Sequence, residues 1–246
     1  MFANYAMNLE GTNNVRDLGG YSTLDGKYTK KGQFLRGDNP ALITVKDCED
    51  LYHYGVRAQI DLRSSYECDK APSGLIGYKD VKYHHFAMLD NINSNPGDAK
   101  IPDSMSEIYI NLLENKQESF RDIFRLILQY PKECVFFNCT AGRDRTGVMA
   151  LLILKLANCS NDTIIADYLA TDWNIRVELQ EMLEEVKKYC ADAKNPMREP
   201  RLAIEETLQF FDKTYGTADN YFLQIGLSEP EIAGVKRKIV EQRAES

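Results

Sequence analysis

The sequence has no apolar segment long enough to cross a membrane. Its longest apolar run extends from Val148 to Leu154 and ends at Lys155, whereas a membrane-spanning helix needs about 20 apolar residues. The first residues, MFANYAMNLE, also lack the basic start and the apolar stretch of a signal peptide. We therefore expect a cytoplasmic protein without a membrane span.

Signals for metal ions, cofactors and nucleic acids are missing as well. The 6 cysteines include no C-x-x-C pair, and the 3 histidines do not have the spacing of metal ligands. Basic residues are fewer than acidic ones, 30 against 37, and the net charge of −7 repels polyanions. We predict no metal site, no cofactor and no nucleic-acid partner, although a local basic pocket could still bind a small anionic substrate.

What is present is the pattern of an α/β domain. With 246 residues, of which 43% are hydrophobic, the chain can bury a substantial core. Apolar runs and alternation predict strands, and helical periodicity with capping pairs such as Thr44/Asp47 and Ser228/Glu231 predicts helices. The expected strands are 56–62, 81–86 and 134–137, and the expected helices are 44–55, 104–113, 118–129 and 148–157, with further helices from about 201 and 228.

The predicted fold is a central, mostly parallel sheet flanked by helices, with a helical C-terminal elaboration. The short apolar strand 134–137 lies between helices, as buried strands of parallel sheets do. Because no linker is visible, we predict a single domain over 1–246, with an α/β core in 1–158 and a helical part in 159–246. An apolar stripe at helical spacing in the latter consists of Ile175, Leu179, Met182, Val186 and Tyr189.

The segment CTAGRDR, which follows the predicted strand 134–137, has the chemistry of an anion-binding loop. Around a helix N-terminus, its backbone N–H groups turn inward as a nest for an anion. Arg145 can offer two parallel N–H donors to a phosphate. The same positive environment favours the thiolate of Cys139, a nucleophile for phosphoryl transfer that Thr146 can hydrogen-bond. The predicted phosphate loop is 138–146, with phosphate-binding residues Thr140, Ala141, Gly142, Arg143 and Thr146.

FNCTAGRDRTG resembles the phosphate-binding loop HCxxGKDRTG of the bacterial family of cysteine-dependent tyrosine phosphatases. The resemblance continues in NNVRDLGG, FLRGD, VRAQIDLRSSYE and YGTADNYFLQIGLSEPEI, and so covers nearly the whole chain. It implies an α/β phosphatase fold and hydrolysis of phosphotyrosine through a phospho-cysteine on Cys139. Some members also hydrolyse phosphoserine, phosphothreonine or phosphoinositides. The implied partner is a phosphorylated protein or a small phosphate ester.

Two residues of the loop depart from the family pattern. Asn138 replaces the histidine before the cysteine; it can support the loop by hydrogen bonds but carries no charge to stabilise the thiolate. Arg143 replaces a lysine, which keeps the positive charge, so a second anionic group beyond the scissile phosphate can still be bound. In the family, this second cation is associated with the turnover of phosphoinositides.

The acid that protonates the leaving group has two candidates. A leaving alkoxide needs a proton donor far more than a leaving phenolate does. The resemblance implies Asp144, inside the loop, because the family lacks the mobile Asp loop of eukaryotic tyrosine phosphatases. Asp90 follows the strand 81–86, where dual-specificity phosphatases have their acid. Either residue could instead be a solvated or loop-capping carboxylate.

Other charged residues are candidates for supporting the loop. Arg16 and Asp17 in NVRDLGG are expected to brace the sheet and the phosphate loop. Asp61 and Arg63, together with Glu67, either bind substrate or pair with one another at a strand end.

Other functions are compatible with an anion-binding cysteine loop. Sulfur transferases and arsenate-type reductases also place a cysteine in such a nest, but the RTG continuation and the match over the whole chain argue against them. Asn138 raises the alternative of a catalytically weak or inactive phosphate-binding pseudophosphatase. Because Cys139, Asp144 and Arg145 are all retained, and a binder needs no nucleophile, we favour a catalytic phosphatase.

Overall fold

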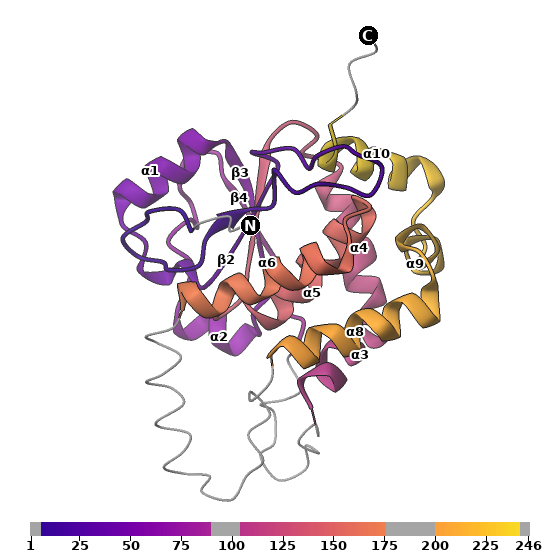
Figure 1. Ribbon diagram of the computed structural model, residues 1–246. Helices are drawn as coiled ribbons and strands as arrows, with labels where there is room; N and C mark the ends of the chain where they lie inside the picture. Colours follow the sequence, from indigo (N-terminus) through magenta and orange to yellow (C-terminus); the bar gives the residue numbers. More distant parts are fainter. Residues whose placement is uncertain (1–5, 90–103, 176–199, 242–246) are drawn as a thin grey trace, which may run out of the picture.

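The computed structural model describes residues 6–89, 104–175 and 200–241 (Figure 1). Its strands form one sheet in the order β1-β2-β5-β3-β4. β1 pairs with β2 in antiparallel fashion, and all other neighbours are parallel. The prediction of a mostly parallel sheet flanked by helices is therefore confirmed. The strands are β1 (Arg16–Asp17), β2 (Phe34–Gly37), β3 (Val56–Asp61), β4 (Lys82–His85) and β5 (Cys134–Asn138).

Helices cover both faces of the sheet. Val135 and Phe137 of β5 belong to one hydrophobic cluster, and Cys134 and Phe136 belong to another on the opposite face. The second cluster packs against α1, and the first packs against α3, α4, α5 and the later helices. The helices are η1 (Pro40–Leu42), α1 (Val45–Tyr54), α2 (Ser65–Lys70), α3 (Met105–Asn115), α4 (Gln117–Ile127), α5 (Asp144–Leu156), α6 (Asn161–Asn174), α8 (Pro200–Tyr215), α9 (Ala218–Gln224) and α10 (Glu229–Ile239).

Local signals in the sequence determine where these helices begin and end. The capping box of Thr44 and Asp47 begins α1, and Gly55 ends it with a φ of 111°, as predicted. The predicted capping box at the start of α10 is also present. Helix α2 was missed, although Ser64 and Glu67 form a capping box at its start.

The helices that follow residue 159 contribute to the same hydrophobic cluster as α5. The division into a core of 1–158 and a helical part of 159–246 within one domain stays a prediction. Of the apolar stripe, Ile175 is buried, and Leu179, Met182, Val186 and Tyr189 lie outside the described residues. Within the described ranges, no helix is long and apolar enough to cross a membrane.

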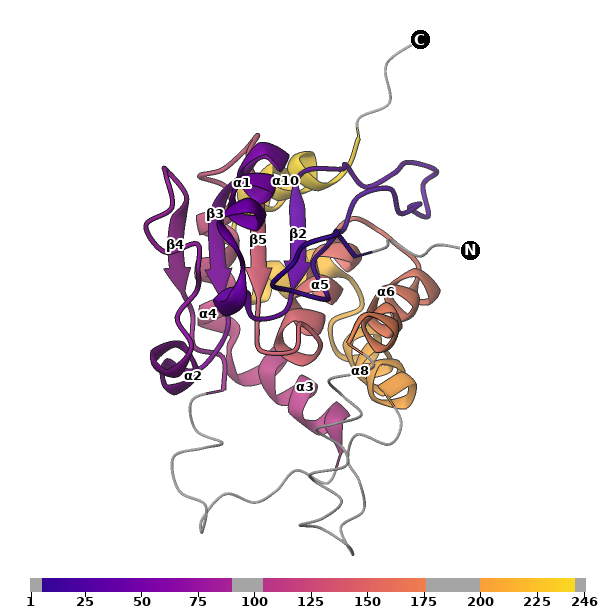
Figure 2. The ribbon, with the colours of Figure 1, turned by 90° about the vertical axis from the view of Figure 1, so that its left-hand side faces the viewer.

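The strands place the predicted phosphate loop at the end of the sheet where the parallel strands have their carboxyl ends. Figure 2 shows β2, β3, β4 and β5 side by side, with their arrowheads toward the end of the sheet where α2 and α3 lie. β5 is the middle strand, and the chain runs from its end through the loop 139–143 into α5. Ligands of open α/β sheets bind outside the carboxyl ends of the strands. The loop therefore lies where the fold favours a binding site.

Candidate active site

The loop between β5 and α5 is held closely against the end of β2. Gly142 has a φ of 67°, and a Cβ atom there would lie 2.6 Å from the carbonyl carbon and oxygen of Gly37. Glycine therefore fits both the conformation and the available space. Asn14 and Arg36 donate hydrogen bonds to the carbonyl of Gly142, at 3.4 and 2.7 Å. Because this carbonyl oxygen is hydrogen-bonded to Asn14 and Arg36, backbone N–H groups of the loop can point away from these two residues and together bind an anion.

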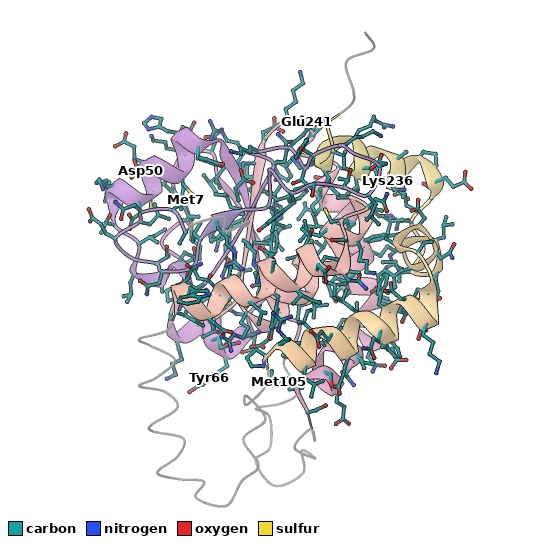
Figure 3. The ribbon with its side chains drawn as sticks, viewed as in Figure 1. Met7, Asp50, Tyr66, Met105, Lys236 and Glu241 are labelled. Carbon is teal, nitrogen blue, oxygen red and sulfur yellow. The ribbon has the colours of Figure 1, made fainter. Side chains whose placement is uncertain are left out.

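A cavity of about 260 Å³ lies over this loop. Cys139 lines it with only 2% of the residue exposed. Figure 3 labels Met105, which lines the cavity, and Tyr66, the neighbour of Glu67, on the same side of the molecule. The structure thus brings most of the predicted loop residues into one cavity. Its lining comprises Glu67, Met105, Tyr109, Cys139, Thr140, Ala141, Arg143, Asp144, Arg145, Tyr168 and Pro200.

Arg145 lies in the first turn of α5 and forms a bidentate ion pair with Glu67 of α2. Its Nη1 and Nη2 atoms donate to the two carboxylate oxygens at 2.6 and 2.9 Å. The hydroxyl of Thr140 also donates to Glu67. Burial alone would raise the pKa of Glu67, but the hydrogen bonds from Arg145 and Thr140 outweigh it and hold this pKa well below its usual value. Glu67 therefore fixes the charged guanidinium beside the loop.

Replacing Glu67 by glutamine is expected to lower the free energy of unfolding at pH 7 by about 2 kcal/mol, because hydrogen bonds between charged groups are lost. The pKa of Glu67 is lower in the folded chain than its ordinary value of 4.5. Its stabilisation is therefore complete above about pH 4.5 and is lost as the pH falls further. Urea denaturation at pH 7 and pH 3 should show a smaller difference between Glu67→Gln and the wild type at pH 3. An equal difference at both would contradict the ion pair.

Asp144, the first residue of α5, accepts a hydrogen bond from Tyr109, one of two buried tyrosines that are in contact with each other. Tyr109 of α3 donates to Asp144 Oδ1, and the hydroxyls of Tyr109 and Tyr168 lie 2.6 Å apart. Burial, together with the negative charge of Asp144, raises the pKa of Tyr109. The phenol therefore keeps its proton and remains a donor. This hydrogen bond engages Oδ1 and orients the carboxyl group of Asp144.

Arg143 provides a second cation in the cavity, and it is paired. Its Nη2 atom donates to the carboxylate of Asp172 in α6. The side chain of Arg143 is 6% exposed and that of Asp172 is 37% exposed. The predicted second positive charge therefore faces the cavity with a carboxylate already bound to it.

Asn138, the last residue of β5, is buried in a hydrogen-bond network beneath the loop. Its amide oxygen accepts a hydrogen bond from Gln59 at 2.8 Å, and its amide nitrogen donates to Asp61 at 3.3 Å. Gln59 in turn accepts from Ser73 at 2.7 Å. Asn138, which carries no charge itself, thus connects β5 to β3 beneath the loop. Gln59 and Ser73 were not among the residues predicted from the sequence.

Asp61 and Arg63 form a buried ion pair and do not line the cavity. Arg63 Nη2 lies 2.6 Å from Asp61 Oδ2, and its Nη1 donates to Asn39 and to the carbonyl of Ala71, both at 2.7 Å. Of the two interpretations given for these residues, pairing at the strand end describes the geometry. Glu67, the third member of that group, faces the cavity instead.

Arg16 belongs to a buried network that lies under the loop. Both Arg16 and Arg36 form ion pairs with Asp167 of α6. Asn14 accepts a hydrogen bond from Arg16 and donates one to the carbonyl of Ala141 at 3.0 Å. Asn14, Arg36 and Asp167 were not among the residues predicted from the sequence. Arg36 is the arginine of the FLRGD segment, so that motif is the signal that could have identified it.

Asp17 supports the sheet, one part of its expected role, from the side opposite to Arg16. Its carboxylate accepts hydrogen bonds from the backbone N–H groups of Gly19 and Gly32, at 2.8 and 2.7 Å. The physical reason is the alternation of side chains along β1, which directs Asp17 away from its neighbour Arg16. Asp17 therefore holds the turn that follows β1.

Thr146 and Asp90 are the remaining residues that the sequence predicts for the site. Thr146 is buried, and its hydroxyl donates to the carbonyl of Gly37 at 3.5 Å. That contact ties α5 to β2, in place of the expected hydrogen bond to the thiolate of Cys139. Asp90, the other candidate for the general acid, lies outside the described residues.

A thiol, an arginine and a carboxylic acid around one anion-binding loop are the groups that phosphoryl transfer through a cysteine requires. This arrangement is typical of cysteine-dependent phosphatases. The tyrosine phosphatase family matches residues 7–241. The chain belongs to that family, and the protein is a phosphatase enzyme.

The chain is also similar to individual known proteins. A tyrosine-protein phosphatase of Nostoc commune is 27% identical over 217 residues, which cover 84% of this chain and 74% of the relative. The triple specificity protein phosphatase PtpB of Mycobacterium tuberculosis is 24% identical over 270 residues, covering 91% of this chain and 95% of PtpB. The solved structure of a cysteine-to-serine variant of P. aeruginosa TpbA in complex with pTyr is 9% identical and covers 92% of this chain and 98% of that chain, with a TM-score of 0.44.

Proposed function

We propose that the protein hydrolyses phosphotyrosine in proteins through a phospho-cysteine intermediate on Cys139. The observation that carries this proposal is the single cavity that Cys139, Arg145 and Asp144 line together. Met105 and Tyr109 give the same cavity an apolar and aromatic wall, which suits the ring of a phosphotyrosine.

In the first step, the thiolate of Cys139 attacks the phosphorus atom, and the bond from phosphorus to the tyrosine oxygen breaks. The loop N–H groups bind the remaining phosphoryl oxygens, where negative charge develops. Arg145 adds those of its five N–H donors that Glu67 does not occupy. Asp144 gives its proton to the leaving oxygen, so that tyrosine leaves neutral.

In the second step, a water molecule attacks the phospho-cysteine. The bond between phosphorus and sulfur breaks, Asp144 accepts a proton from the water, and inorganic phosphate and the thiolate are released. The same carboxyl group therefore acts first as acid and then as base. The hydrogen bond from Tyr109 keeps it oriented in both steps.

We include phosphoserine and phosphothreonine among the substrates. Phosphoinositides, the further class implied by the resemblance, carry a second anionic group and would also need Arg143, whose Nη2 atom already donates to Asp172. The similarity to a triple specificity phosphatase supports this breadth. An alkoxide leaving group requires a proton more than a phenolate does. Asp144, which lines the cavity beside Cys139, can donate that proton. A binding-only role has less support, because the nucleophile, the arginine and the acid all line the cavity.

The test is a rapid-quench single turnover with a phosphotyrosine peptide labelled with radioactive phosphate. We expect label to appear on the protein, to be absent from Cys139→Ser, and to decay as inorganic phosphate is released. Peptides that carry phosphoserine or phosphothreonine, and a phosphoinositide, would then establish the breadth. Binding of the peptide with neither label on the protein nor released phosphate would contradict the proposal and favour the binding-only role.

Tyr109→Phe removes the hydrogen bond to Asp144 with little change in volume. For a phosphoserine peptide we expect kcat to fall about tenfold at unchanged KM, the effect of one hydrogen bond to a charged group. Hydrolysis of 4-nitrophenyl phosphate should change less than about twofold, because nitrophenolate leaves without a proton. Tyr221→Phe is the matched control, since Tyr221 is buried and donates to the carbonyl of Leu113 at 3.2 Å. Equal losses for both substrates would argue against an orienting role.

A further inference from the structure

The pairing of Arg143 with Asp172 bears on which substrates the cavity accepts. Arg143 lines the cavity together with Cys139 and Arg145, so it lies beside the position of the scissile phosphate in the proposed function. A guanidinium has five N–H donors and binds planar or tetrahedral anions well. Without a competing carboxylate, this residue would bind a second anionic group of the substrate.

Asp172 is such a carboxylate, supplied by the protein itself. It comes from α6 and its side chain is 37% exposed, whereas the side chain of Arg143, to which it is bound, is 6% exposed. A second anion on a substrate would have to displace this carboxylate or share the guanidinium with it. Both arrangements cost free energy, because the ion pair is broken or two negative charges are brought together in a partly desolvated cavity.

We propose that Asp172 is a specificity determinant that blocks the second anion site on Arg143 and thereby selects phosphate monoesters with no further anionic group beside the scissile phosphate. This inference rests on the proposed function, which places the scissile phosphate on the loop of Cys139. It assigns Asp172 no part in the chemical steps. Asp172 affects only the binding of substrate, because it occupies the guanidinium of Arg143.

The test compares two ligands that differ by one anionic group, phenyl phosphate and 1,3-phenylene bisphosphate. Their dissociation constants are measured by calorimetry on Cys139→Ser, with and without Asp172→Asn. We expect Asp172→Asn to tighten the binding of the bisphosphate about tenfold, as expected from the loss of one close repulsive charge. The binding of phenyl phosphate should change less than about twofold.

Two further variants make the result specific to this ion pair. Asp212→Asn is the matched control: Asp212 is 39% exposed and pairs with Lys155, outside the cavity, so neither ligand should be affected. Adding Arg143→Met to Asp172→Asn should abolish the gain, because the cation that receives the second anion is then missing. A gain for both ligands alike, no gain, or a gain that persists without Arg143 would overturn the role of Asp172.

Turnover of the same two compounds separates this inference from the proposed function. With Cys139 intact, Asp172→Asn should lower KM for the bisphosphate about tenfold at nearly unchanged kcat. If the wild type hydrolyses neither compound, the proposed function fails, and the binding measurements on Cys139→Ser still decide the role of Asp172. If the wild type hydrolyses both but the variant shows no fall in KM, the role of Asp172 fails alone.

Discussion

Cys139→Ser is expected to lower the hydrolysis of 4-nitrophenyl phosphate by at least about 10⁴-fold, to the background of the assay. A serine hydroxyl is not ionised near neutral pH, so the variant lacks the anionic nucleophile on which covalent catalysis depends. Cys139 is 2% exposed at the base of the cavity, and serine has nearly the same size. The loss should therefore appear in kcat, while binding of phosphate to the loop is retained.

The measurement is initial rates from pH 5 to pH 8 in the presence of a chelator, with folding checked by circular dichroism. Cys68→Ser is the matched control, because Cys68 lies in α2, one residue from Glu67, and does not line the cavity. We expect it to retain activity within about twofold. Substantial activity in Cys139→Ser, or an equal loss in Cys68→Ser, would contradict a nucleophilic role for Cys139.

Local sequence signals predicted much of the fold because they act within a few residues. The capping box that begins α1 requires only Thr44 and Asp47, and Gly55 ends the helix through its own backbone conformation. The buried strand β5 was evident from its apolar run and from its place between helices. Helix α2 was missed because its 6 residues are too few for a visible period, so that its capping box was the only local signal.

In the candidate site too, residues of one local segment could be predicted, whereas contacts between distant segments could not. Cys139, Asp144 and Arg145 lie within one loop and its helix, so the motif could identify all three, and the structure places them in one cavity. The pairing of Glu67 with Arg145 and of Asp172 with Arg143 could not be deduced from the residues alone, although Glu67 itself was a candidate. Glu67 is 78 positions from Arg145, and only the packing of α2 against the loop brings the two together. No local pattern encodes such a distance along the chain.

The buried network under the loop is the clearest case of such long-range pairing. Asp167 lies 151 positions from Arg16 and 131 from Arg36, and all three side chains are at most 1% exposed. Burial opposes the charge of Asp167, but Arg36 and Arg16 hold its pKa below its usual value. Two arginines against one carboxylate leave a net positive charge beneath the loop. Since Arg36 donates to the carbonyl of Gly142, this charge lies where it favours a bound anion.

Asp167→Ala is therefore expected to lower the free energy of unfolding by about 3–5 kcal/mol, because removing one partner leaves two buried guanidinium groups uncompensated. That is a large part of the stability of an ordinary domain. Urea denaturation at pH 7 measures the loss. Asp219→Ala is the control: it breaks an ion pair between Lys236 and Asp219, whose side chains are 40% and 46% exposed. This variant should lower the free energy of unfolding by less than about 1 kcal/mol.

Asp167→Asn keeps the volume and part of the hydrogen bonding, so it gives a folded protein to measure even where the alanine variant does not fold. We expect a loss of stability smaller than that of Asp167→Ala, together with weaker binding of phosphate to the loop. The reason is that Arg36 bonds both Asp167 and the carbonyl of Gly142, so losing the carboxylate frees the guanidinium that positions the loop. Unchanged stability and unchanged phosphate binding in Asp167→Asn would show that the loop holds its shape without the buried charges.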